Sequence, residues 1–283
     1  MKIAIVTDSI ASISKEDSEK YEIQVVPLNL LFEGKIYRDG IDLTVEQAYE
    51  VLEKNPDHFS TSAPSPGDFL QAYRKAAASA EKIICLTVAK GISATYDSAR
   101  MAQGLFKTEF PKKELEVINT QTATVGQALL ILTTARMINE GKDFNEIIKI
   151  IQNLREKTQT YLLLETIRYI YRTGRIPEIA SKIGGIMPFK PILKIADDKM
   201  HFGGMANSKE KGVKKIINIL KENINSSHPE IGITHNSAPE EAEALKEKIQ
   251  SLFPKSNIFI TLCSPIIGYG TGPGLLGIAF YSK

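Results

Sequence analysis

Short apolar runs alternate with amphipathic helical patterns through the first half of the chain. The apolar runs lie at 3–9, 24–28, 82–88 and 114–120. Apolar residues at helical spacing lie at 45–54, 66–80, 95–106, 122–141 and 144–158. Buried strands that alternate with amphipathic helices predict βαβ units and a parallel sheet. In such a sheet, a ligand binds beyond the carboxyl ends of the strands.

The pattern changes near residue 157. An apolar stretch at 162–175 leads into a segment rich in Ile, Pro and Gly at 176–191. Strand patterns then lie at 191–196, 199–204, 232–236, 258–263 and 276–282, and helical patterns at 209–224 and 239–253. We therefore expect an N-terminal α/β domain over residues 1–157 and a second domain over residues 158–283, with the boundary between 155 and 160.

The composition is that of an ordinary globular protein. The chain has 283 residues, of which 43% are hydrophobic and 24% are charged, so two lobes with a cleft between them are possible. The net charge of +2 gives no argument for a nucleic-acid partner. Lysines cluster on the helical pattern near the middle of the second half, without interleaved aromatic residues. We interpret them as a solvated face, and a surface that meets an acidic partner is the alternative: Lys209, Lys211, Lys214, Lys215 and Lys221. No stretch approaches the 18 apolar residues of a membrane helix, so we expect a cytoplasmic protein.

Several kinds of site are disfavoured by residue spacing. Cys85 and Cys263 lie inside apolar runs, which is typical of buried strand thiols and not of a disulfide. The histidines are too far apart for a metal site, which predicts that no metal is bound: His58, His201, His228 and His235. The glycine-rich run GYGTGPG at 268–274 lacks the Lys-Ser/Thr of a phosphate loop, and no cofactor is expected.

Four hydroxyl- and glycine-rich segments are candidates for binding an anionic head group. They are 7–12, 60–66, 90–96 and 268–274, and we interpret them as turns. Ser and Thr hydroxyls, together with backbone N–H groups at a helix start, can hold a carboxylate or a phosphate. Any one of these segments could instead be a simple helix cap. The presence of four such segments in one chain favours a ligand-binding site.

Seven segments, taken in this order and spacing, resemble the DegV family along the whole chain. They are VTDSIASIS near the start, VVPLNLLFEGKIYRDGIDLT at 25–44, TSAPSPGDF at 61–69, GISATYDSA at 91–99, YIYRTGRI at 169–176, KPIL at 190–193 and TGPGLLGIAF at 271–280. The family includes the fatty-acid-binding subunits of bacterial fatty acid kinase. The resemblance implies a parallel-sheet α/β domain, then an α+β domain with a mixed sheet, and a lipid between them.

The resemblance implies a head-group site for the carboxylate of a long-chain fatty acid such as palmitate, stearate or oleate. Its members would be Thr61, Ser62, Ser93, the Ala94 amide, Gly270 and Thr271. The acyl chain would enter a tunnel in the second domain. The candidates for its lining, any one of which could equally be an ordinary core residue, are Leu163, Ile167, Ile170, Ile183, Ile186, Met187, Ile192 and Leu193. Burying about fifteen methylenes at about 0.8 kcal/mol each is worth roughly 12 kcal/mol before entropy costs, so the tail would dominate binding.

The chain departs from the family pattern at several positions. Gly270 stands where many members have a histidine, and Tyr269 beside it could supply a hydroxyl or be a core residue. Asn207 stands at the position of an arginine that contacts the kinase in kinase-binding members. Ala94 replaces a glycine, and Asn119-Thr120 replaces the usual Asp-Ser. These departures bear on coupling to a kinase more than on lipid binding.

The preferred interpretation is a non-catalytic carrier that presents the carboxylate to a separate ATP-dependent kinase, which would form acyl phosphate for phospholipid synthesis. One alternative is an enzyme that acts on a small acyl or phosphorylated substrate through the Ser93 and Thr61 hydroxyls, although no GxSxG elbow or partner histidine accompanies Ser93. Another is a regulatory protein that holds lipid without kinase coupling. We expect a monomer without a nucleic-acid partner that is able to contact a membrane peripherally.

Overall fold

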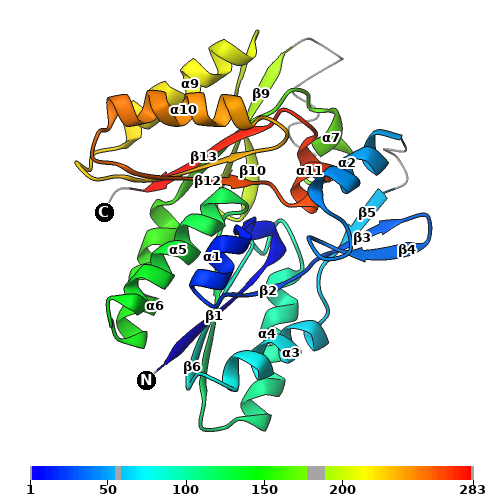
Figure 1. The fold of residues 1–283 in the computed structure, drawn as a ribbon, viewed down its shortest axis with the longest axis vertical. Helices are drawn as coiled ribbons and strands as arrows, with labels where there is room; N and C mark the ends of the chain where they lie inside the picture. Colours follow the sequence, from blue (N-terminus) through cyan, green and yellow to red (C-terminus); the bar gives the residue numbers. More distant parts are fainter. Residues whose placement is uncertain (1, 55–58, 177–188, 282–283) are drawn as a thin grey trace.

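A computed structural model describes residues 2–54, 59–176 and 189–281. The chain forms two larger sheets and one small one, with helices between and around them (Figure 1). The strands are β1 (Ile3–Asp8), β2 (Gln24–Val26), β3 (Asn29–Phe32), β4 (Lys35–Arg38), β5 (Phe59–Ser62), β6 (Lys82–Thr87), β7 (Glu114–Asn119), β8 (Gln159–Leu163), β9 (Lys190–Ala196), β10 (Lys199–Ala206), β11 (Glu230–His235), β12 (Asn257–Leu262) and β13 (Leu276–Tyr281). The helices are the short 3-10 helix η1 (Ser9–Ala11), α1 (Lys15–Lys20), α2 (Val45–Lys54), α3 (Pro66–Ala77), α4 (Thr95–Glu109), α5 (Val125–Asn139), α6 (Phe144–Lys157), α7 (Arg168–Arg172), α9 (Lys209–Asn223), α10 (Pro239–Leu252) and α11 (Pro265–Thr271).

The N-terminal sheet is parallel, with the strand order β2-β1-β6-β7. Its strands are the four continuous apolar runs of the first half, because both faces of the sheet are covered. Helices α3 and α4 cover one face, and α5 and α6 pack on the other. The prediction of a parallel sheet is confirmed. The carboxyl ends of β1, β6 and β7 lead into the segments that approach the second sheet.

The second sheet is mixed, with the order β10-β9-β8-β13-β11-β12. Its neighbours run antiparallel except β11 and β12, which are parallel. Helices α9 and α10 pack on one face and form a core with β8, β9, β11 and β13. The expected fold class, a parallel α/β part followed by an α+β part with a mixed sheet, is confirmed. The division at 157/158 into two domains stays a prediction.

Helix α5 lies between the two larger sheets. It packs against β1 and β6 on one side and against β11 and β13 on the other (Figure 1). Almost every side chain from Val125 to Ala135 is buried, which explains why its sequence is apolar all round instead of amphipathic. The Thr122 and Thr160 hydroxyls share a hydrogen bond of 2.8 Å beside the start of α5 and join the two halves of the chain.

Two elements that form the site differ from the sequence expectation. Residues 60–66 were expected to be a turn, but Thr61 and Ser62 end strand β5 of a small antiparallel sheet with the order β4-β3-β5. The run 268–274 was also expected to be a turn, but its first four residues complete helix α11. Both errors have one cause, because these elements are too short and too rich in Ser, Thr or Gly to show a periodic apolar pattern.

The predicted burial of the two thiols is confirmed. Cys85 lies in β6 and Cys263 directly follows β12, and both are free and inaccessible to solvent. Burial raises the pKa of each thiol to about 12, so neither is a reactive thiolate at neutral pH. Within the described ranges, no helix combines the length and the apolar character that crossing a membrane requires.

Candidate functional site

An apolar cavity lies between the N-terminal loops and the second sheet. Its volume is about 50 Å³, and most of its lining is aliphatic. The described residues that line it are Ile10, Thr61, Ile92, Ala123, Thr124, Leu162, Ile170, Thr173, Arg175, Ile195, Met200, Ile266, Ile267, Tyr269, Gly270 and Thr271. The cavity therefore draws on η1, β5, β8, α7, β9, β10 and α11, and neither half of the chain forms it alone.

A wider and more polar mouth of about 490 Å³ adjoins this cavity. The mouth and the cavity share Thr61, Ile92, Thr173, Arg175 and Tyr269, and the mouth adds two further residues of β5 and one of α7, Phe59, Ser60 and Arg172. An apolar interior with a few polar groups and two guanidinium groups at one end suits an elongated ligand with an anionic end.

Arg175 is the cation at the junction of the cavity and the mouth. Its Nε donates a hydrogen bond of 2.9 Å to the Ile92 carbonyl, which fixes the guanidinium beside the loop that carries Ser93. Burial lowers the pKa of this guanidinium, which means that desolvation disfavours the charge where it sits. An anion beside Arg175 would offset that cost. Sequence reasoning missed this residue, although a charged side chain in the apolar segment YIYRTGRI was a signal for it.

Arg172 lies at the outer side of the mouth. Its guanidinium is 5.1 Å from the ring centre of Tyr169 and 5.6 Å from that of Tyr269. The two rings hold the cation in place through the attraction between a positive charge and an aromatic face. Arg172 therefore adds positive charge to the mouth without being the group nearest to the apolar cavity.

Thr61 and Ser62 face opposite sides of β5. Thr61 lines both the cavity and the mouth, and its hydroxyl makes no hydrogen bond to any described residue. Ser62 is exposed and accepts a hydrogen bond of 3.3 Å from the Asn29 side chain. Alternate residues of a strand point to opposite faces, so Ser62 does not line the cavity with Thr61, and a head-group role for Ser62 stays a prediction.

Ser93 lies on the loop between β6 and α4, beside the cavity but not in its lining. Its hydroxyl shares a hydrogen bond of 2.8 Å with the Thr95 hydroxyl, and its N–H donates to the Ala89 carbonyl at 3.2 Å. Ala94 is exposed at the start of α4, outside the cavity lining. Among the described loop residues, Ile92 is the one that reaches the cavity and the mouth, directly before Ser93.

Helix α11 brings Tyr269, Gly270 and Thr271 to the cavity. The Tyr269 hydroxyl donates a hydrogen bond of 2.8 Å to the Phe59 carbonyl, so it serves to join α11 to β5. The Thr271 hydroxyl donates to the Ile267 carbonyl of its own helix at 2.7 Å. Gly270 has ordinary helical geometry, and a Cβ there would make only normal contacts, 3.7 Å from Thr173. The position thus has room for the start of a side chain.

Three polar side chains hold α11 and the loop after it. At the start of the helix, the Ser12 hydroxyl accepts from the Ser264 N–H at 3.0 Å, and the Asp39 carboxylate accepts from the Ile266 N–H at 3.1 Å. At its end, the Asn236 side chain donates to the Gly272 carbonyl. Sequence reasoning missed these residues, because their importance comes from contacts with segments far away in the chain.

The substitution Asp39→Asn is expected to raise the melting temperature at pH 8 and to leave it unchanged at pH 4. Burial raises the pKa of Asp39 to about 6 and that of its neighbour Asp8 to about 7, from an ordinary value of 3.8. A carboxyl group whose pKa is higher in the folded state stabilises the fold most below the unfolded pKa, and that stability is lost as the pH rises through the folded pKa. Asparagine keeps an acceptor for the Ile266 N–H without a buried charge, so the gain in the free energy of unfolding at pH 8 should be about 3 kcal/mol. Melting curves from pH 4 to pH 8 measure it, and equal curves at pH 8 would contradict the assignment.

The expected tunnel residues divide between the two faces of the second sheet. Ile170 lines the cavity, and Leu193 and Ile167 belong to the same apolar cluster without lining it. Leu163 and Ile192 form a pair across β8 and β9 and belong to the core under α9 and α10, so they do not line this cavity, and their place in a tunnel stays a prediction. The paired residues one position away, Leu162 and Leu193, lie on the cavity side because strands alternate. The candidates Ile183, Ile186 and Met187 lie outside the described residues.

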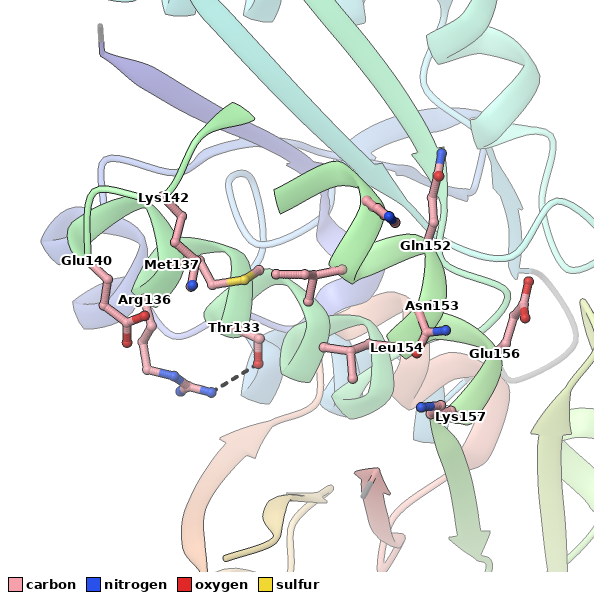
Figure 2. Close-up of a pocket in the computed structure, with 12 residues that line it drawn as sticks. Thr133, Arg136, Met137, Glu140, Lys142, Gln152, Asn153, Leu154, Glu156 and Lys157 are labelled. Atoms are coloured by element: carbon pink, nitrogen blue, oxygen red, sulfur yellow. Dashed lines mark hydrogen bonds between the residues drawn. The ribbon is translucent and has the colours of Figure 1, made fainter. Parts of the chain in front are cut away.

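A larger groove of about 750 Å³ lies between α5 and α6, away from these residues (Figure 2). Two of the charged side chains that line it have partners on the protein. Arg136 bonds Glu230 and the Thr133 hydroxyl at 2.8 and 3.0 Å, and Lys142 pairs with Glu146 at 3.0 Å. The groove contains none of the expected site residues, and the smaller cavity remains the candidate site.

The fold is that of a two-domain α/β protein with an apolar cavity between a parallel and a mixed sheet. The sequence model described as "Uncharacterised protein, DegV family" matches residues 2–283. The chain belongs to the DegV family.

Relatives of known sequence or structure cover the whole chain. A DegV domain-containing protein of Clostridium acetobutylicum is 30% identical over 284 residues, which span 100% of this chain and 99% of that protein. A structure described as fatty acid binding of a DegV family protein from Thermus thermophilus superposes with a TM-score of 0.91 at 25% identity, covering 100% of both chains. A stearic acid-binding protein from Eubacterium ventriosum has a TM-score of 0.91 at 26% identity, covering 99% of this chain and 98% of that one.

Proposed function

We propose that this protein binds a long-chain fatty acid, with the acyl chain in the apolar cavity and the carboxylate at the mouth beside Arg175. The observation that carries the proposal is the position of a half-buried guanidinium at the junction between the cavity and the mouth. Fatty-acid binding is also named for the similar proteins of Thermus thermophilus and Eubacterium ventriosum.

The two ends of the site would contribute in different ways. Each methylene moved from water into the cavity is worth about 0.8 kcal/mol, so the tail supplies most of the affinity. The guanidinium and the Thr61 hydroxyl would fix the carboxylate through charge-assisted hydrogen bonds. Because the inner cavity is small, the tail requires adjacent side chains to change rotamer, and the unbranched side chain of Met200 is suited to that.

The proposed role is that of a carrier without catalysis of its own. Ser93, the candidate nucleophile of the alternative enzyme, shares a hydrogen bond with the Thr95 hydroxyl, which is not a base. A carboxylate at the mouth would be within reach of a second protein. We therefore include in the proposal that a separate ATP-dependent kinase phosphorylates the bound fatty acid there.

Native mass spectrometry of the purified protein tests the binding proposal directly. We expect an adduct with the mass of one long-chain fatty acid, or stoichiometric uptake of added oleate. A protein that is folded, consistently empty and unable to bind oleate or palmitate would overturn the proposal.

The carrier role needs a second assay. Oleate, ATP and the catalytic subunit of a fatty acid kinase are incubated with and without this protein. Acyl phosphate that forms only when the protein is present supports presentation of the carboxylate. If oleate binds but acyl phosphate never forms, the lipid serves a regulatory role instead.

Thr61→Val is expected to weaken oleate binding by about tenfold, since it removes one hydrogen bond to a carboxylate, worth about 1.5 to 3 kcal/mol. Ser62→Ala is the matched control, because Ser62 lies next to Thr61 but on the other face of the strand. Its affinity should equal that of the unmodified protein in the same titration. Equal affinities for all three proteins would remove Thr61 from the site.

A further inference from the structure

The turn between β9 and β10 contacts the N-terminal half of the chain. Ala196 and Lys199 pair across the two strands, and the two residues between them, Asp197 and Asp198, have φ angles of 51° and 64°. This is a two-residue hairpin turn of the type that requires positive φ at both central residues. We call residues 196–199 the hairpin turn. Its second aspartate points away from its own sheet, toward the end of β7.

Asn119 at the end of β7 joins the hairpin turn to the loop that carries Ser93. Its Nδ2 donates a hydrogen bond of 2.8 Å to the Asp198 carboxylate. Its Oδ1 accepts from the backbone N–H groups of Lys90 and Gln121, each at 3.2 Å. These two donors fix the orientation of the amide, so the group that faces Asp198 is an N–H donor. The side chain is 7% exposed, and all of these bonds are at least partly shielded from water.

The backbone of the hairpin turn also rests on the same loop. A Cβ at Gly91 would lie 2.3 Å from the Asp198 carbonyl oxygen, closer than any side chain can approach. Gly91 is two residues before Ser93 and directly before Ile92, whose carbonyl accepts the bond from Arg175. The loop is therefore held at Lys90 by Asn119, at Gly91 by the hairpin turn and at Ile92 by Arg175.

The strands on either side of the hairpin turn reach the apolar cavity. Ile195 on β9 and Met200 on β10 line it, one residue outside the turn at each end. The hairpin thus touches the proposed tail site with its strands and the proposed head-group loop with its turn. One rigid element connects the two ends of the ligand site.

We propose that Asn119 and Asp198 are a positioning pair that holds the Ser93 loop at the correct distance from the acyl-chain cavity. This inference rests on the proposed function and assigns the pair no contact with the ligand. The pair acts through the loop that presents Ile92 and through the anchor of Arg175. Loss of the pair releases the loop from the hairpin and misplaces the groups that face the carboxylate.

Asp198→Gly is the first test, because glycine adopts the positive φ of this turn without strain. It removes the carboxylate that Asn119 contacts, and oleate binding should weaken by about five- to tenfold, as for the loss of a charge-assisted bond. Asp197→Gly is the matched control in the same turn and should bind oleate normally. Asp198→Asn keeps an oxygen acceptor for Asn119 and should restore binding. If Asp198→Gly binds oleate as tightly as the unmodified protein, the proposal is overturned.

The reciprocal exchange separates positioning from a general loss of packing. Asn119→Asp places the carboxylates of residues 119 and 198 face to face. The nearby Arg155 side chain donates to the backbone carbonyl of residue 119. We expect this variant to lose about tenfold or more in oleate affinity through like-charge repulsion. Adding Asp198→Asn to it recreates the bond with donor and acceptor exchanged, and affinity should return. No recovery in a double variant that melts normally would refute the pairing, whereas an unmodified protein that never binds oleate would refute the proposed function instead.

Discussion

Arg175→Gln is expected to weaken oleate binding by about a hundredfold while the fold remains intact. The guanidinium can make two hydrogen bonds to a carboxylate, and charge-assisted bonds of this kind are worth about 1.5 to 3 kcal/mol each. Glutamine retains an N–H donor for the Ile92 carbonyl but carries no charge. Isothermal titration with oleate measures the loss, and a melting curve establishes that the variant is folded.

Two further variants separate the charge of Arg175 from its hydrogen-bonding geometry. Arg168→Gln removes an exposed arginine at the start of α7 and should leave oleate binding unchanged, which controls for the net charge of the region. Arg175→Lys keeps the charge without the planar fork and should lie between the two glutamine variants. If Arg175→Gln binds like Arg168→Gln, the carboxylate does not bind beside Arg175.

Ala123→Leu is expected to reduce oleate affinity by about fiftyfold, because it fills the apolar cavity from one wall. Ala123 is 2% exposed and lines the cavity between β7 and α5. The added carbons would displace about three methylenes of the tail, at about 0.8 kcal/mol each. Titration with oleate measures the loss, and Ala123→Ser, which adds one atom in place of three, should show little of it. Normal oleate binding by a folded Ala123→Leu variant would place the tail elsewhere.

The elements that could be predicted from the sequence are those whose neighbours bury them uniformly. The strands at 3–8, 82–87 and 114–119 are continuous apolar runs because helices cover both faces of their sheet. Helix α11 was missed, because PIIGYGT has three small or helix-breaking residues and no apolar stripe. That helix is stabilised from outside, by the bonds of Ser12 and Asp39 to its first turn.

The sequence indicated which segments meet at the candidate site, but not which side chains of those segments line it. Segments 60–66 and 268–274 were expected to approach one ligand site, and the structure brings Thr61, Gly270 and Thr271 to one cavity. The choice between Thr61 and Ser62, or between Leu162 and Leu163, depends on the face to which a strand turns each residue. That face is set by pairing with β3 and β9, which a single sequence does not reveal.

The strand order of the mixed sheet determines when this sheet can form during synthesis of the chain on the ribosome. Strand β13 lies between β8 and β11, although it follows both of them by a long stretch of chain. Until its residues emerge, β8 and β11 have no common neighbour, while the parallel sheet at 3–119 already has all of its strands. Synthesis from the N-terminus therefore completes segments 7–12, 60–66 and 90–96 well before the mixed sheet closes. A nascent chain in that interval has no enclosed place for a lipid tail, so under the proposed function a fatty acid would bind only after β13 has inserted between β8 and β11.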